Sequence, residues 1–241
     1  LGGGSVLLNA GRDVANVDAV VPTNARLTKD SQMIELGGGD LSVRAGRNLD
    51  AGVYYVERGA GRLTAGGSIM TNATRSPSLT NLSGAAPLAA QTWLPTMLFA
   101  GKSAFDVRAG GDVLIAPAAN PFLLPGGYNN SFWYKTYFST YSDQAAVSVT
   151  SYSGSVTLRS SSTLPSVGGG GATPVLLAWI QNQLLYNAQN PSTASFYHPW
   201  LRLNETGVDA FSTVTTLAPS TLRLAALGGD VNLQGSLTLS P

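Results

Sequence analysis

Aromatic side chains are concentrated in one stretch of the chain, and their rings are the first candidates for contact with a ligand. Aromatic faces stack on sugar rings and contribute strongly to protein interfaces. The stretch therefore predicts a site for a glycan or a protein partner. The alternative is that the rings pack an insertion onto the body of the fold. The candidate binding residues are Trp133, Tyr134, Tyr137, Phe138 and Tyr141, with Tyr128, Phe132 and Lys135 nearby.

A second group of candidates combines arginine with acidic residues. Guanidinium groups bind anionic oxygens through paired N–H donors, so such a group could hold an acidic glycan. The alternative is that these charges pair with one another on the surface of the fold. The group comprises Arg44, Arg47, Arg58 and Arg62, among which lie Asp40, Asp50 and Glu57.

The residue types that support most catalytic and metal chemistry are scarce. The chain has no cysteine and one histidine, His198, which excludes disulfides, thiolate or histidine-cluster metal sites and a cysteine nucleophile. His198 lies in a second aromatic cluster at residues 196–200 and is expected to be a packed or surface residue. Glycan-cleaving enzymes need paired carboxylates or a carboxylate with a basic residue. The nearest pair is Asp106 and Asp112, and Asp112 is expected in a turn. We therefore expect no catalytic residue, no metal, no cofactor and no enzymatic activity.

Two short repeats must position these candidates. The first is Gly, then Asp or Ser, then two aliphatic residues with one residue between them, and it occurs at 4–8, 39–43, 111–115, 154–158, 229–233 and 235–239. The second places Ala-Gly before a polar residue and an aliphatic residue, at 10–14, 45–49, 65–69 and 109–113. Repeated short strands of this kind bury their apolar faces by stacking, which predicts a β-solenoid.

The copy at 39–49 shows the expected geometry of one coil. Leu41, Val43 and Ala45 alternate with polar residues, so one face of the strand is apolar. Gly46 is expected to supply a positive φ at the turn. Asn48, like the Asp residues at equivalent positions, is expected to satisfy turn amides with its side-chain oxygen.

Composition and organisation narrow the class further. The 241 residues carry a net charge of +1 and only 11% charged residues, so no nucleic-acid partner is expected. Residues 1–115 are predicted as coils with loop decorations, one of them irregular at 17–34. Residues 116–216 are predicted as an insertion region, with coil strands at about 145–159 and a helix at about 174–188 that begins with Thr173 as N-cap and Pro174. Residues 217–241 return to coils. Both ends read as cut from a continuing structure, so we expect a segment of a longer protein.

Three stretches resemble the filamentous-haemagglutinin family of exoproteins, which are exported by two-partner (type Vb) secretion. They are residues 37–69, residues 137–147 and residues 222–239, the last centred on Ala-Leu-Gly-Gly-Asp-Val. They are similar to an uncharacterised module found late in many such proteins. The resemblance implies a right-handed parallel β-helix, export through an outer-membrane two-partner transporter, and a place outside the cell or on the bacterial surface. It brings no catalytic residues.

The predicted fold is therefore all-β, a right-handed parallel β-helix with loop insertions and one helical insertion. The predicted function is structural: a rod segment of a large surface exoprotein, either an adhesin or a contact-dependent toxin stalk. Its expected partners are the transporter during export, neighbouring coils of the same parent chain, and a host or bacterial surface glycan or receptor. The alternatives are a carbohydrate-binding module that uses the aromatic stretch and a glycan-cleaving β-helix.

Overall fold

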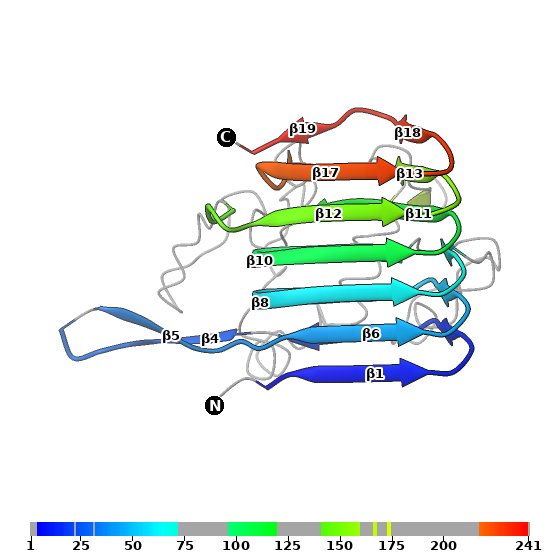
Figure 1. Cartoon of the computed structure of the whole chain (residues 1–241). Coiled ribbons are helices and arrows are strands. Elements are labelled where there is room, and N and C mark those ends of the chain that lie inside the picture. Colours follow the sequence, from blue (N-terminus) through cyan, green and yellow to red (C-terminus); the bar gives the residue numbers. More distant parts are fainter. Residues whose placement is uncertain are drawn as a thin grey trace.

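The computed structural model describes residues 4–21, 23–30, 32–71, 96–119, 141–159, 166–167, 173–174 and 217–240. These residues form strands, turns and bends, and none of them lies in a helix. Most of the strands belong to one parallel sheet, in which segments far apart in the sequence lie side by side (Figure 1). The prediction of an all-β fold with parallel strand pairing is confirmed.

The front row of the sheet contains strands that point the same way and stack one above another (Figure 1). The chain returns to this row repeatedly, so that Val6 pairs with Leu41, Leu41 with Gly61, and Gly61 with Phe105. The row consists of β1 (Val6–Ala10), β6 (Leu41–Ala45), the second halves of β8 (Val53–Ala65) and β10 (Thr96–Ala109), β12 (Ala146–Ser151) and β17 (Thr221–Ala226).

Two further rows follow each front strand, and we call one pass of the chain through the rows a layer. The second row consists of β2 (Val14–Ala15), β7 (Leu49–Asp50), β9 (Ile69–Met70), β11 (Val113–Ala119), β13 (Val156–Arg159) and β18 (Val231–Gln234). The third row contains β3 (Ala19–Val21), the first halves of β8 and β10, and the end of β11. In addition, β16 (Leu217–Ala218) pairs with β19 (Thr238–Leu239). Because β11 continues to Ala119, strand structure crosses the predicted boundary at residue 115.

Inward-facing side chains form continuous apolar columns. In β6, Leu41, Val43 and Ala45 are buried while Arg44 is exposed, which confirms the predicted alternation. Parallel neighbours pair residue against residue, so the same inward position recurs one strand spacing away in each layer. One column runs through Val6, Leu41, Gly61, Phe105, Val147 and Leu222. At Gly61 the column lacks a side chain, and the ring of Phe105 occupies that space.

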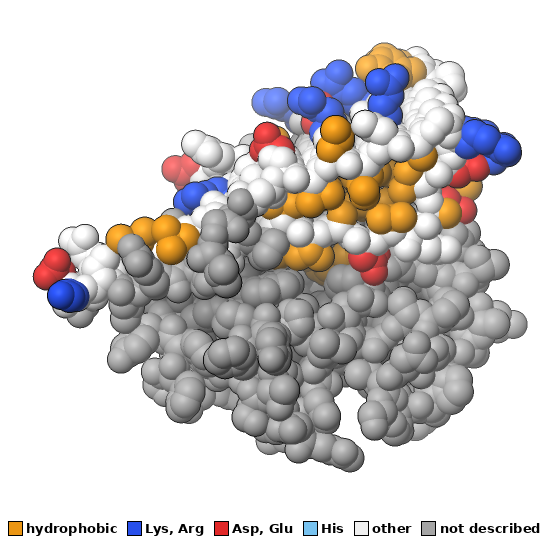
Figure 2. Space-filling view, turned by 90° about the horizontal axis from the view of Figure 1, so that it is seen from below, with side chains coloured by type: hydrophobic (Ala, Val, Ile, Leu, Met, Phe, Trp, Pro, Cys, Tyr) orange, Lys and Arg blue, Asp and Glu red, His pale blue; other side chains and the backbone are white. Residues whose placement is uncertain are grey.

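These apolar columns are exposed at both ends of the stack. Val113 and Val156 are at most 1% exposed, whereas Val231 in the same column of β18 is 46% exposed. At the opposite end, Val6 and Leu8 are only partly buried. Figure 2 shows hydrophobic side chains at the surface of this β1 end. The end layers thus keep the apolar faces of internal layers, and no described strand covers them.

The glycines of the turns allow successive layers to stack closely. The prediction that Gly46 supplies a positive φ is wrong. Its φ does not lie in the left-handed region. A Cβ atom on Gly46 would instead overlap the carbonyl group of Gly11 in the preceding layer. A Cβ atom on Gly66 would overlap the carbonyl of Gly46 in the same way, and a Cβ atom on Gly110 would overlap that of Gly66. The repeated Ala-Gly pair therefore marks the point where successive turns are too close for any side chain.

Two elements outside the parallel sheet differ from the sequence predictions. The stretch expected to be irregular contains an antiparallel hairpin of β4 (Thr23–Leu27) and β5 (Met33–Gly37), which projects from the sheet (Figure 1). The predicted helix start is wrong, because Thr173 and Pro174 form β15 (Thr173–Pro174), which pairs with β14 (Ser166–Val167). The remainder of that predicted helix, 175–188, lies outside the described residues.

Candidate functional site

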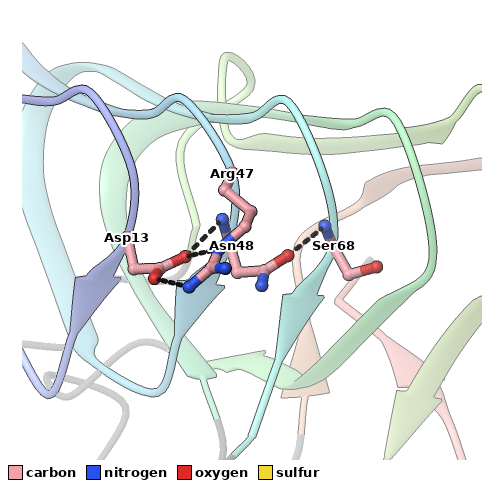
Figure 3. Close-up of polar contacts among 4 residues, drawn as sticks. All are labelled: Asp13, Arg47, Asn48 and Ser68. Atoms are coloured by element: carbon pink, nitrogen blue, oxygen red, sulfur yellow. Dashed lines mark hydrogen bonds and ion pairs between the residues drawn. The ribbon is translucent and has the colours of Figure 1, made fainter.

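A ladder of side-chain hydrogen bonds connects the turns between the front and second rows. At one turn position each layer carries an Asp, Asn or Ser, whose side-chain oxygen accepts a hydrogen bond from the backbone N–H at the same position in the next layer (Figure 3). The donor–acceptor distances lie between 2.8 and 3.1 Å. This turn ladder consists of Asp13, Asn48, Ser68, Asp112, Ser155 and Asp230.

The residue that follows a ladder residue donates a backbone hydrogen bond to the carbonyl of the ladder residue in the next layer. The N–H of Val14 donates to the carbonyl of Asn48 at 2.9 Å, and the N–H of Leu49 donates to the carbonyl of Ser68 at 3.0 Å. The same bond recurs along the stack up to Val156, whose N–H donates to the backbone carbonyl of Asp230. The prediction that Asn48 and its equivalents satisfy turn amides is confirmed for amides of the next layer. The ladder thus satisfies turn groups that stacking removes from water.

Asp13 carries an additional ion pair with the layer above it. The Arg47 guanidinium donates through Nε to Oδ1 at 2.8 Å and through Nη2 to Oδ2 (Figure 3). The bonds from Arg47, helped by the N–H of Asn48 and by the charge of Arg12, lower the pKa of the Asp13 carboxyl to about 2 against an opposing effect of desolvation. A paired, charge-assisted contact therefore ties the first layer to the second.

We expect Asp13→Asn to reduce the pH dependence of stability. The pKa of Asp13 in the folded chain is about 2, below its usual 3.8, so its ionised form stabilises the fold above about pH 4. That contribution is lost as the pH falls through about 2. Urea unfolding between pH 7 and pH 2 should therefore show a smaller loss of free energy of unfolding in the variant below about pH 4. Asp143→Asn, at an exposed turn, is the matched control. Equal pH dependence in Asp13→Asn and the unmodified chain would contradict this expectation.

The charged group predicted from the sequence is distributed over several places. Arg47 is paired, but its partner is the carboxylate from the preceding layer. Arg58 donates through Nη2 to the carbonyl of Gly37 at 2.8 Å. Glu57 is buried and accepts a hydrogen bond from the Tyr55 hydroxyl at 2.6 Å. All three residues therefore have structural contacts, but only Arg47 is paired with an opposite charge, as the paired-charge alternative predicts.

A groove lies on the outward face, near the carboxyl ends of the front-row strands. Its volume is about 510 Å³, and residues from three successive layers line it. Arg62 comes from β8, Arg108 from β10, and Tyr152 from the turn after β12. Gly66 and Gly110 also line the groove with their backbone. We call this feature the basic groove.

The two arginines of the basic groove have different surroundings. Arg108 pairs with Asp106 on its own strand, with Nε to Oδ1 at 3.0 Å and Nη2 to Oδ2 at 2.8 Å. The contact with Asp106, and to a smaller extent Tyr152, raises the pKa of Arg108. Arg62 is exposed and forms no ion pair within the described part of the chain. The groove can therefore offer the Arg62 guanidinium, beside Asp106 at the paired position of β10, and an aromatic ring to an anionic ligand.

Of the aromatic binding candidates, the structure places Tyr141. Its side chain is 6% exposed and belongs to the core cluster, and burial raises the pKa of its hydroxyl. Tyr141 therefore packs the core, as the packing alternative predicts. Trp133, Tyr134, Tyr137 and Phe138 lie outside the described residues, as does the aromatic cluster at 196–200. The proposed binding role of these residues remains a prediction.

The acidic pair considered for glycan cleavage is engaged in structural contacts. Asp106 holds Arg108, and the Oδ1 atom of Asp112 accepts the turn-ladder bond from the Ser155 N–H at 2.8 Å. Within the described ranges, no group of three or more His, Asp or Glu side chains is placed to hold a metal ion. The same part of the chain contains no helix that could cross a membrane.

The sequence analysis did not single out Arg108 or Tyr152. A usable signal exists for Arg108, because Val-Arg-Ala-Gly occurs both at 43–46 and at 107–110. Aligning these copies places Arg44 and Arg108 in one outward column, with Thr64 between them. Tyr152 has no such signal, since its layer replaces the Ala-Gly turn with a different sequence.

The described residues define an all-β protein whose main parallel sheet carries a polar ladder in its turns and a basic groove on its outward face. No protein-family model, curated protein or solved structure matches the chain. Its function is therefore inferred from its own geometry.

Proposed function

We propose that the chain is a structural segment of a large secreted bacterial exoprotein of the filamentous-haemagglutinin type. In this proposal the parallel sheet is the body of a right-handed parallel β-helix, and each layer is one coil. The order in which the chain visits the rows supports it, because a front strand is followed by a turn and a second-row strand in every layer (Figure 1). The segment would hold an adhesive or toxic region at a distance from the cell surface.

The observation that carries this proposal is the continuity of the stack up to two end layers that no described strand covers. The apolar columns run from β1 to β18 and are exposed in both end layers. Exposed strand edges with apolar faces promote aggregation unless something covers them. Neighbouring coils of a longer chain would cover both ends with the contacts already used between internal layers. A rod built in this way needs no disulfide, and the chain contains no cysteine.

Intact bacteria that produce the protein provide the test of this function. Antibodies against the chain should label unpermeabilised cells, or detect the protein in the culture medium, and added protease should remove the surface signal. Deleting the outer-membrane partner transporter should abolish both signals. A cytoplasmic protein serves as the control for lysis. Detection of the chain only after lysis, in the soluble cytoplasmic fraction, would contradict the proposal.

The basic groove supports a second function, binding of an acidic saccharide. Arg62 can bind a carboxylate or sulfate through paired N–H donors, and Tyr152, which is 53% exposed, can stack against a sugar ring. This site replaces the buried Tyr141 as the best-placed candidate within the described residues. It would give the rod an adhesive contact along its side.

We expect Arg62→Ala and Tyr152→Ala each to weaken binding of an acidic oligosaccharide by about tenfold. For Arg62, a lost hydrogen bond to a charged group costs about 1.5–3 kcal/mol. For Tyr152, a lost stacking contact costs about 0.5–1.5 kcal/mol, and 1.4 kcal/mol corresponds to a factor of ten. Calorimetric titration with a carboxylated oligosaccharide and its neutral analogue measures the effect. Lys29→Ala, at the tip of the hairpin, is the control with the same change of charge. Equal affinity for both saccharides would exclude this function.

A further inference from the structure

We infer that the two ends of the stack are complementary and that a second copy of this chain docks on them head to tail. The β17 and β18 layer of one copy would contact the β1 and β2 layer of the next, in the register used between internal layers. This inference concerns the chain by itself. It goes beyond the proposed function, in which neighbouring coils of the parent chain occupy the same two ends.

The turn ladder supplies matching donors and acceptors at the two ends. Every internal ladder residue accepts a bond from the ladder residue above it, and Asp230 occupies the last position, where no described layer follows. At the opposite end, the N–H of Asp13 occupies the donor position that Asn48 and Ser68 use within the stack. A docked copy would bring the Asp13 N–H to the Asp230 carboxylate. The N–H of Val231 would meet the carbonyl of Asp13, as that of Val14 meets Asn48.

The apolar columns match in the same register. Val6 pairs upward with Leu41, and Leu222 pairs downward with Val147. Val6 and Leu222 are therefore the two ends of one column. In a head-to-tail junction, apolar residues would face one another at each inward position. The pairs are Leu222 with Val6, Leu224 with Leu8, Ala226 with Ala10, and Val231 with Val14.

The glycines at the β1 end leave room for a preceding layer. A Cβ atom on Gly39 or Gly46 would overlap the layer below. The equivalent glycines of the first layer are Gly4 and Gly11, and a Cβ atom on either has nothing within 4 Å. The first layer therefore keeps the two positions without side chains that close stacking requires, although no described layer stacks there.

The charges at the junction are compatible with docking. Asp230 would lie one layer below Asp13, but Asp13 is paired with Arg47 and lies near Arg12. Outward-facing Arg223 would lie beside Leu7, which carries no charge. The interface joins two different surfaces of the same chain, so it does not close on itself. Association of this type produces linear assemblies that lengthen with concentration.

Two variants block one end each and leave the other end intact. Gly11→Val places a side chain in the space that a preceding copy must occupy, and that space is empty in the single chain. Val231→Lys places a charge in the apolar column at the other end, at a side chain that is already 46% exposed. Ile34→Lys, on the projecting hairpin, is the matched control for the added lysine. Circular dichroism and thermal unfolding check that each variant folds.

Sedimentation velocity over a concentration series tests the inference. We expect the unmodified chain and Ile34→Lys to form species that lengthen with concentration. Gly11→Val and Val231→Lys should each stay monomeric, with self-association at least about tenfold weaker. An equimolar mixture of the two should form a dimer and nothing larger, because it contains one open end of each kind.

Two results would overturn the inference. One is an unmodified chain that stays monomeric throughout the series, and the other is self-association that neither variant weakens. Neither result bears on the proposed function, because that function is tested by surface labelling of intact cells, where coils of the parent chain cover the ends.

Discussion

Replacing Gly66 with alanine should destabilise the chain by about 2–3 kcal/mol, because the new Cβ atom would overlap the backbone carbonyl of Gly46 in the layer below. The peptide that carries this carbonyl is fixed on both sides, because the N–H of Gly46 donates to Ala10 and the N–H of Arg47 donates to Arg12, both in the preceding layer. The turn would therefore have to separate locally from its neighbour. Urea unfolding followed by circular dichroism measures the change in the free energy of unfolding.

Gly11→Ala is the matched control for this prediction. Gly11 occupies the same turn position in the first layer, and a Cβ atom there has nothing within 4 Å. Its effect should stay within about 0.5 kcal/mol, or be slightly stabilising because alanine reduces the freedom of the unfolded chain. If both variants lose the same stability, the close stacking of the turns is not the reason for the repeated glycine.

Phe105→Ala should cost about 3–5 kcal/mol, the largest effect expected of a single side chain in the described core. The ring is 1% exposed and occupies both its own place in the apolar column and the space above Gly61. Its removal leaves a cavity that the fixed spacing of the layers prevents from collapsing. Leu7→Ala is the control, since Leu7 is 67% exposed, and it should change stability by less than about 0.5 kcal/mol.

A double-mutant cycle separates packing at this position from general loss of the ring. In the unmodified chain, Gly61→Ala would press a Cβ atom against the Phe105 ring. In the Phe105→Ala background that contact is gone, so the same substitution should cost less by about 1 kcal/mol or more. Additive effects of the two substitutions would show that the ring does not fill the space above Gly61.

The repeating part of the fold could be predicted from the sequence because its signals are local. The alternation at Leu41, Val43 and Ala45 specifies a buried face, and the structure buries all three side chains. The acceptor role of Asn48 follows from residue type alone. Gly46 shows what could not be predicted. This position requires glycine because a carbonyl of another layer lies against it, and not because of its own φ. A single copy of the repeat contains no information about how closely the next copy approaches.

The candidate site was harder to predict because its residues come from different layers. Arg47 lies next to several acidic residues in the sequence, but its partner is Asp13, which stacking brings beneath it. Arg62, Arg108 and Tyr152 form the basic groove only after the strands are placed in register. The sequence favoured an aromatic stretch instead, and its one described member, Tyr141, is in the core. Residue type indicated that aromatic rings prefer buried contacts. It did not indicate whether those contacts are with a ligand or with the core of the same chain.

Cryo-electron microscopy of the proposed exoprotein is the most direct test of a continuous stack. In the density we expect layers about 4.8 Å apart that continue past β1 at one end and past β18 at the other, as one rod. The turn ladder should continue with an Asp, Asn or Ser at the same position in the adjoining layers. Layering that stops at β1 or β18, with the chain forming an isolated body, would contradict the account.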